Sequence, residues 1–421
     1  MPSAKGFACS IYDEILRRLR PKELIQAISI GTRKIRAEGE HGRITLPYRS
    51  FNRIYVCGAG KASAGLAQAA VKQLGQRVAG GLVVTKYGHG FPMGPVSCRL
   101  AGHPIPDDGS LSAGIAMLSF AAECQEGDLV LFFLSGGASA LMEAPIEGVS
   151  LKDLATVSDH LLKAGASILE LNAVRSRLSR IKGGGLGRAF GKATVVCFVL
   201  SDVLGNDLSV IGSGPLWKPS QLDAFAIAER YDLTKQLSEA ARAALEEPAA
   251  SGGTEIRHVI LGDAGLVLSA AMAASKIHRL KPLVYGHPMT DEARIEASRL
   301  VDQAKILTPP FCLIATGETV VKVKGQGKGG RCQEFACAAA ELIKGWPNTA
   351  VLAGSTDGTD GPTNVAAGVV DGDSADQAAI SVRDALAEND SLRFLESCGG
   401  LIRTGPTQCN LNDVYMIVRL A

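Results

Sequence analysis

A first group of residues that could do chemistry is Gly58-Ala59-Gly60-Lys61, which follows the apolar run at residues 53–57. A strand that ends in glycines and leads into a helix leaves backbone N–H groups and a positive helix dipole for an anion. Lys61 adds a compact positive charge that suits phosphate or carboxylate. The spacing of a Walker A loop is absent, so the segment predicts a general anion site. The alternative is a plain strand-to-helix turn with a solvated lysine.

A second group, Ser-Gly-Gly-Ala-Ser at residues 135–139, follows the continuous apolar run at residues 128–134. Two serines, two glycines and the start of a helix again predict a cradle for an anion. The stretch lacks the G-x-S-x-G pattern of a serine hydrolase. A tight turn without a ligand is the structural alternative.

Two further groups lie downstream in the same half of the chain. Arg175 belongs to a basic stretch that runs into the glycines at 183–185, and its guanidinium could bind a carboxylate or phosphate in a fork. Asp202 ends the apolar run at 193–200, where an unpaired aspartate would be costly to bury. It could therefore hold Mg²⁺ or accept a hydroxyl proton. A solvated helix face and a turn or cap are the alternatives for these two residues.

A fifth group lies in the second half of the chain. Arg331 opens a predicted helix after a glycine-rich stretch at 325–330, which suits clamping an anion. The stretch matches G-x-G-x-x-G, but the acidic residue expected about 20 positions on is missing, so a dinucleotide site is weakly supported. Asp357 and Asp360 end another strand and are candidate magnesium ligands or bases, or else turn formers.

The elements that must position these groups read as alternating short apolar strands and helices, which predicts α/β folding with a mostly parallel sheet. Strands are expected near 53–57, 81–88, 97–103, 128–134 and 193–200, and again near 256–263, 282–287, 311–318, 319–325, 349–358 and 414–420. Asp108 is expected to cap the helix that follows it. Ligands bind beyond the carboxyl ends of strands in such sheets, so the five groups could face a common crevice.

Composition excludes several classes of protein. Lys and Arg number 44 against 42 Asp and Glu, so the net charge of +2 does not favour nucleic acid or a membrane surface as partner. The ten cysteines contain no C-x-x-C pair, which argues against a zinc site and fits a reducing compartment. No apolar run approaches the ~18 residues of a spanning helix. We therefore expect a cytoplasmic protein. Glycine cradles, cations and aspartates together suit phosphoryl transfer with Mg²⁺.

The motifs in their order also resemble a known family, the glycerate 2-kinases with a C-terminal domain called MOFRL. The resemblance is carried by GAGKAS, HPIPD, LSGGASAL, NAVRSRLSRIKGGGL, LSDV, GSGP, GETVVKVKGQGKGGR, STDGTDGPT and TGPTQCNLND. The chain departs from the family pattern at Cys332, Leu216 and Cys409, where Asn, Thr and Thr are usual.

The resemblance implies two α/β domains, which we place at residues 1–230 (Rossmann-like) and 231–421 (MOFRL type), with the active site in the cleft between them. It implies ATP- and Mg²⁺-dependent phosphorylation of D-glycerate to 2-phosphoglycerate. Expected catalytic residues are Lys61, Arg331 and Asp202; expected substrate-binding residues are Lys61, Arg175, Arg331 and Asp360. Expected nucleotide-binding residues are Gly58, Gly60, Ser135, Gly136, Gly137, Ala138, Ser139, Lys182, Gly183, Gly184, Ser213 and Gly214, and expected metal ligands are Asp202 and Asp357.

Two other functions stay open at this point. One is an NAD(P)H-dependent hydroxypyruvate reductase, supported only by the weak G-x-G-x-x-G match; His89, His103 and His287 are isolated and are expected to be structural. The other is a non-catalytic sensor of sugar acids. The expected partners are small molecules, with no nucleic acid and no membrane, and assembly as a homodimer is left open.

Overall fold

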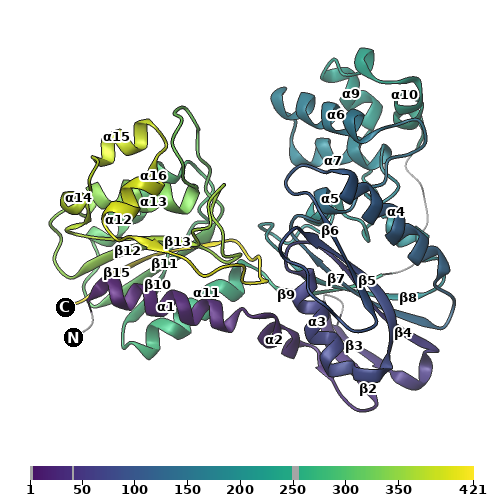
Figure 1. Cartoon of the computed structure of the whole chain (residues 1–421), viewed down its shortest axis with the longest axis horizontal. Helices are drawn as coiled ribbons and strands as arrows, with labels where there is room; N and C mark the ends of the chain where they lie inside the picture. Colours follow the sequence, from purple (N-terminus) through teal and green to yellow (C-terminus); the bar gives the residue numbers. More distant parts are fainter. Residues whose placement is uncertain (1–2, 40–41, 249–255) are drawn as a thin grey trace. The chain divides into compact units, whose positions relative to one another are not determined.

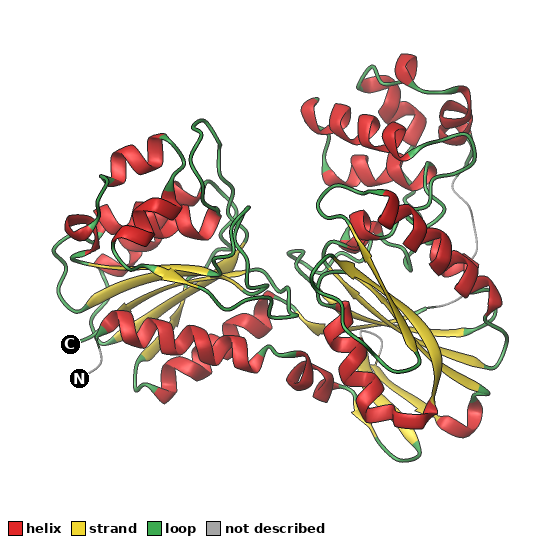
Figure 2. Cartoon of the chain, in the orientation of Figure 1, coloured by secondary structure: helices red, strands yellow, loops and turns green. Residues whose placement is uncertain are grey.

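The computed structural model describes residues 3–39, 42–248 and 256–421. It divides the chain into two compact units: a central unit of residues 24–261, and a terminal unit that joins residues 1–23 to residues 262–421. Each main sheet carries helices on both faces (Figures 1 and 2). None of the described helices combines the length and the apolar character needed to cross a membrane.

The main sheet of the central unit has six strands in the order β6-β5-β4-β7-β8-β9. Its pairs β4–β5, β4–β7, β5–β6 and β7–β8 are all parallel. Every residue of β7 is buried, as its continuous apolar sequence predicts for a strand covered on both faces. The strands are β4 (Arg53–Ala59), β5 (Val78–Lys86), β6 (Val96–Ala101), β7 (Asp128–Ser135), β8 (Thr194–Leu200) and β9 (Arg257–Gly262).

Helices α3 (Ser63–Leu74) and α4 (Asp108–Glu123) pack on this sheet, and the short helices α5 (Ala138–Leu141) and α8 (Gly185–Ala189) pack near α4. The cap of α4 is Asp107, whose carboxylate accepts from the backbone N–H of Ser110 at 2.9 Å. The expectation that Asp108 is the cap was wrong, because Asp108 is already the first helical residue. A small antiparallel sheet completes this part: β1 (Ser29–Ile30), β2 (Lys34–Gly39) and β3 (Gly42–Pro47).

A helical cluster belongs to the central unit as well. It contains α6 (Leu151–Lys163), α7 (Ile168–Arg177), α9 (Ala224–Arg230) and α10 (Glu239–Glu246). One apolar core joins the four helices, with Leu161, Val174, Ile227 and Leu245 among its buried members. Because α9 and α10 pack on α7, the chain stays in the central unit past residue 230, where we placed the domain boundary.

The terminal unit is built on a mixed sheet in the order β10-β11-β15-β12-β13-β14. β10 pairs with β11 in parallel, and the other pairs are antiparallel. The strands are β10 (Lys281–Val284), β11 (Phe311–Gly317), β12 (Thr349–Ser355), β13 (Ala367–Asp371), β14 (Leu401–Ile402) and β15 (Asp413–Arg419).

Helices α1 and α11 cover one face of this sheet, and α12, α13 and α16 cover the other (Figure 1). The N-terminal helix α1 thus packs against strands from the C-terminal part of the chain; its fully buried Tyr12 donates from its hydroxyl to the carbonyl of Ser355 at 2.6 Å. The helices are α1 (Ala4–Arg18), α2 (Pro21–Leu24), α11 (Ala264–Ile277), α12 (Ala293–Lys305), α13 (Arg331–Leu342), α14 (Ser374–Gln377), α15 (Val382–Ala387) and α16 (Ser391–Ser397).

The strand expected at residues 319–325 was wrong. Apart from an isolated bridge at Val320, the segment is irregular, and Val320 and Val323 are exposed. The backbone N–H groups of Lys324 and Gly325 donate to the side-chain oxygen of Asn389, at 2.7 and 3.1 Å. A side chain therefore satisfies the backbone that a neighbouring strand would otherwise pair.

Candidate functional site

The carboxyl ends of three neighbouring strands bring several predicted residues to one edge of the central sheet. β4, β7 and β8 are parallel neighbours, with Ala59 opposite Leu134 and Ser135 opposite Leu200. Lys61, the stretch at 135–139 and Asp202 therefore all follow strands that end at this edge. This is the arrangement that the alternation of strands and helices predicts.

The loop that carries Lys61 is held tightly against the end of β7. The backbone N–H of Gly60 donates to the carbonyl of Val84 at 3.1 Å, and that of Lys61 to the carbonyl of Gly136 at 3.0 Å. The N–H of Ala62 donates to the hydroxyl of Ser135 at 3.0 Å. The expectation that this loop offers free N–H groups was wrong, because Gly60 bonds to β5, and Lys61 and Ala62 bond to the segment at the end of β7. A Cβ on Gly60 would overlap Ser135, so glycine permits the close approach.

The neighbouring loop, in contrast, does offer unused donors. No residue that the structure describes accepts a hydrogen bond from the backbone N–H groups of residues 136–139. Gly137 has φ +86°, a conformation that favours glycine. A Cβ on Gly137 would lie 3.2 Å from the Cγ of Lys61 and 2.9 Å from the Cδ2 of His103, so these two side chains flank it. Gly58 has a packing role, since its Cβ would lie 2.6 Å from the carbonyl oxygen of Phe133.

A network of side chains joins four more of the predicted residues behind this loop. The guanidinium of Arg175 donates to the hydroxyl of Ser139 at 2.7 Å, and the hydroxyls of Ser139 and Ser213 are 2.8 Å apart. The ammonium of Lys182 donates to the carbonyl of Ser139 at 2.8 Å. Three residues, Arg175, Lys182 and Ser213, therefore converge on Ser139.

Lys182 forms a buried ion pair with Glu143, a residue that the sequence analysis missed. Their Nζ and Oε2 atoms are 2.7 Å apart, and the side chains are 0% and 2% exposed. Burial lowers the pKa of Lys182 to about 8, although Glu143 acts against this shift. Glu143 also accepts from the hydroxyl of Ser179 at 2.5 Å and from the N–H of Ala144 at 3.0 Å. No motif marks Glu143 in the sequence; its role depends on the fold.

The glycines after Lys182 hold two loops together. The N–H groups of Gly183 and Gly184 donate to the carbonyls of Ser213 and Gly214, at 3.0 and 2.8 Å. Both have positive φ, +54° and +77°. Their backbone donors are thus engaged inside the protein.

Asn172 is, after Glu143, a second residue at this site to which we assigned no role from the sequence. Its side-chain oxygen accepts from the hydroxyl of Ser213 at 3.1 Å, whereas its amide nitrogen is buried and has no partner among the described residues. A buried polar atom without a partner calls for an explanation, such as a ligand or water. Its place three residues before Arg175, one turn away on α7, was the signal available in the sequence.

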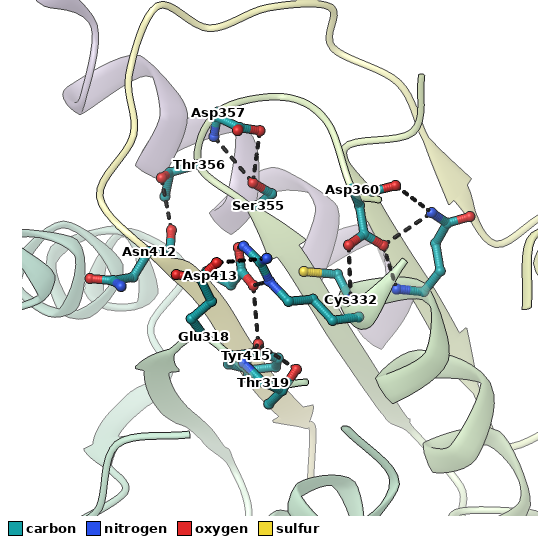
Figure 3. Close-up of polar contacts among 12 residues, drawn as sticks. Glu318, Thr319, Cys332, Ser355, Thr356, Asp357, Asp360, Asn412, Asp413 and Tyr415 are labelled. Carbon is teal, nitrogen blue, oxygen red and sulfur yellow. Dashed lines mark hydrogen bonds and ion pairs between the residues drawn. The ribbon is translucent and has the colours of Figure 1, made fainter. Parts of the chain in front are cut away.

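In the terminal unit, Arg331 lies at a similar meeting of strand ends. β11 and β12 both run antiparallel to β15, which places Gly317, Asp413 and Ser355 in register at one edge. Arg331 begins α13 and donates to Asp413 from Nε at 2.5 Å and from a terminal nitrogen at 3.2 Å. Its other terminal nitrogen lies 2.7 Å from Glu318 (Figure 3). Arg331 is therefore held by two carboxylates, and Asp413 is a residue that we did not predict.

Asp360 supports the first turn of the same helix. Its carboxylate accepts from the N–H groups of Cys332 and Gln333, at 3.1 and 2.8 Å, and from the amide of Gln333 at 3.0 Å (Figure 3). Burial, together with the charge of Asp413, raises the pKa of Asp360 to about 6. Burial also raises the pKa of the adjacent Cys332 thiol well above its usual value, so the thiol is protonated at neutral pH.

The side chain of Asp357 stabilises the turn in which it lies. One carboxylate oxygen accepts from the hydroxyl of Ser355 at 3.0 Å and from the N–H and hydroxyl of Thr359, each at 2.9 Å. Within residues 3–39, 42–248 and 256–421, no group of three or more His, Cys, Asp or Glu side chains is placed to hold a metal ion. A magnesium ion that is bound mainly by substrate phosphates needs only one or two carboxylates.

Comparisons with known proteins identify the family of the chain. Residues 7–246 match a domain of unknown function (DUF4147), and residues 311–413 match the MOFRL family. The chain is 39% identical over 388 residues to the D-glycerate 2-kinase of Thermotoga maritima, covering 88% of this chain and 92% of that protein. It is 37% identical over 393 residues to an Agrobacterium vitis protein provisionally named hydroxypyruvate reductase, covering 89% of each. The crystal structure of the T. maritima glycerate kinase matches with a TM-score of 0.86 and 34% identity, over 99% of both chains.

Proposed function

This chain belongs to the glycerate kinase family, phosphotransferases that act on an alcohol group, and on that premise we propose that it transfers the γ-phosphoryl group of ATP to the C2 hydroxyl of D-glycerate. The observation that carries this proposal is the loop at residues 136–139. It presents backbone N–H groups that no described residue uses, and Lys61 lies beside it. Such a loop suits the phosphates of a nucleotide.

The network behind the loop supports a division of roles. Ser139, Ser213 and Arg175, which bond to one another beside the loop, are proposed to contact phosphate oxygens. Lys182 is fully buried and bound to Glu143 and to the carbonyl of Ser139, so it positions the loop. Gly183, Gly184 and Gly214 act in the same way, because the N–H of Gly183 bonds to Ser213 and that of Gly184 bonds to Gly214. Gly58 and Gly60 let the two loops approach closely.

Lys61 and Asp202 are proposed to act on the reacting groups. Lys61 would neutralise charge on the transferring phosphoryl group, and Asp202 would orient or deprotonate the C2 hydroxyl or hold Mg²⁺. Of the two aspartates predicted as metal ligands, Asp202 fits better: it follows β8 beside the phosphate loop, whereas Asp357 uses one oxygen within its own turn. A bound Mg²⁺ would neutralise charge on the phosphate oxygens.

Arg331 is proposed to bind the glycerate carboxylate. Asp413 is buried and fixes the guanidinium, whereas Glu318 has a side chain that is 50% exposed. Glu318 is thus the partner that a substrate carboxylate would displace. Asp360 is buried against the first turn of α13 and is proposed to position Arg331. The shared site that the resemblance implies for the two domains stays a prediction.

The test is a direct assay of the product. The protein with ATP, Mg²⁺ and D-glycerate should release ADP and form 2-phosphoglycerate, identified by ³¹P NMR. Turnover of NADH with hydroxypyruvate in the absence of ADP formation would contradict the proposal, and an absence of both reactions would favour the sensor. Lys61→Met should lower kcat about 10²–10³-fold, as expected for the loss of one electrostatic stabiliser. Lys72→Met, which changes an exposed lysine on α3, is the matched control.

A further inference from the structure

A cavity of about 460 Å³ lies in the central unit, next to the network around Ser139 but lined by other side chains. Part of its wall is apolar: Ala240, Ala243 and Ala244 on α10, together with Pro219. Its size falls within the range of small-molecule sites, roughly 300–1,000 Å³. The lining residues are Ile146, Glu147, Ser176, Arg177, Ser179, Arg180, Gly183, Arg188, Pro219, Ser220, Ala240, Ala243, Ala244, Glu247 and Pro248.

Three arginines line the cavity, and the proposed function uses none of them. Arg177 ends α7, Arg180 follows it, and Arg188 lies on α8. None of the three forms an ion pair with a residue in the described part of the chain, and Arg188 donates to the carbonyl of Gly183 at 3.1 Å. Burial lowers the pKa of Arg188. Three guanidinium groups around one cavity without paired carboxylates leave positive charge to be neutralised.

The charge of the lining is not purely positive. Glu147 and Glu247 also line the cavity, so three arginines against two glutamates leave a net charge of +1. Within the described ranges, neither glutamate is paired with an arginine of the lining. A planar guanidinium presents several donors in a fork that matches phosphate, and this geometry favours a phosphate group over a chloride ion.

The cavity differs from the site proposed above but shares a wall with it. Arg175 directs its guanidinium to Ser139, whereas Arg177, two residues later on the same helix, lines the cavity. Gly183 links the two places: its N–H donates to the carbonyl of Ser213, and its carbonyl accepts from Arg188. A ligand in the cavity would thus contact the segment that also holds Ser213.

We propose that this cavity binds a small organic phosphate, with the phosphate on Arg177, Arg180 and Arg188 and the apolar part against the alanines of α10. The phosphate belongs to an effector that is separate from the catalytic nucleotide, because none of residues 136–139 lines the cavity. The inference does not rest on the proposed function, because it concerns binding alone.

Calorimetric titration with AMP at fixed ionic strength tests the proposal, with adenosine as the uncharged control. We expect AMP to bind and adenosine to bind much more weakly. R177Q/R180Q should weaken AMP binding about tenfold or more, as expected for the loss of charge-assisted hydrogen bonds. Arg99→Gln, at an arginine of β6 outside the lining, should leave binding unchanged. Ala244→Phe keeps every charge and fills the cavity, so it should also abolish binding.

Each outcome of these titrations either supports or overturns the proposal. Absence of AMP binding at millimolar concentration, or binding that is unchanged in R177Q/R180Q and in Ala244→Phe, overturns the proposal. Binding that is about tenfold weaker or more in R177Q/R180Q and is lost in Ala244→Phe, while thermal unfolding shows that both variants remain folded, supports it. AMP should also bind when ATP is present at saturating concentration. Complete displacement of AMP by ATP would show that the cavity is not a separate site and would overturn the proposal.

Discussion

The buried pair of Lys182 and Glu143 permits a quantitative prediction. Lys182→Met removes the ion-pair partner of the buried Glu143, whose carboxylate then keeps only the weaker attraction of the nearby Arg175. A buried carboxylate in that position takes up a proton, and at pH 7 this costs a glutamate about 4 kcal/mol relative to its reference pKa of about 4.3. The double variant K182M/E143Q has no such charge, and the amide oxygen of the introduced glutamine can still accept from Ser179 and Ala144. The double variant should therefore be more stable than Lys182→Met by roughly 3–4 kcal/mol at pH 7 and by only about 1 kcal/mol at pH 5.

Urea unfolding measures this difference. Trp217 lies in the central unit and Trp346 in the terminal unit, so fluorescence in a Trp346→Phe background reports on the unit that holds the pair. Equal stability of the two variants at pH 7, or a difference that stays constant between pH 5 and pH 7, would refute the reasoning, because an uncompensated carboxylate must respond to protons.

Three further predictions concern the residues around the two sites. Glu318→Gln should lower KM for D-glycerate and leave kcat unchanged or raised, because the exposed partner of Arg331 no longer competes with the substrate. Asp413→Asn should lower kcat at least tenfold, because Arg331 loses the buried carboxylate that holds it. Steady-state kinetics check both, and equal effects of the two variants would contradict the assigned roles. The raised pKa of Asp360, about 6 against 3.8, means that its favourable contribution to stability is full below pH 3.8 and is lost as pH rises through 6. Between pH 4 and pH 6.5, the free energy of unfolding of Asp360→Asn should therefore rise by roughly 3 kcal/mol relative to that of the parent protein, as measured by chemical unfolding. Free energies of unfolding that change with pH in the same way for both proteins would contradict this. Asn172→Ala should raise KM for ATP while changing stability by about 1 kcal/mol or less, because its amide nitrogen loses no partner among the described residues; an unchanged KM would show that the amide meets no ligand.

Much of the central sheet could be predicted from the sequence. Continuous apolar runs such as β7 and β8 indicate strands covered on both faces, and the polar residues that follow parallel strands meet at one edge. Ser139, Arg175, Lys182 and Ser213 do converge there, as separate motifs indicated. The expectation of a strand at residues 319–325 was wrong for a different reason. Alternating Val and Lys are typical of a strand, but the side chain of Asn389, and not a neighbouring strand, accepts the backbone hydrogen bonds there.

Other features depend on contacts that no local pattern reveals. Glu143 follows an ordinary apolar helix, and only the fold brings Lys182 to it. Asp413 lies far along the chain from Arg331, yet the order of β11, β15 and β12 places it beside the start of α13. The N-terminal helix packs in the terminal unit because Tyr12 fits against β12, a contact between residues more than 300 positions apart. For the same reason composition could not show that the central unit begins at residue 24 and ends at residue 261.

The central claim is that the N–H groups of residues 136–139 receive nucleotide phosphates. A crystal structure of the protein with an unreactive ATP analogue, Mg²⁺ and D-glycerate tests it most directly. We expect phosphate oxygens within hydrogen-bonding distance of these backbone nitrogens, with Ser139 and Arg175 beside them. A triphosphate bound elsewhere, with this loop empty, would contradict it.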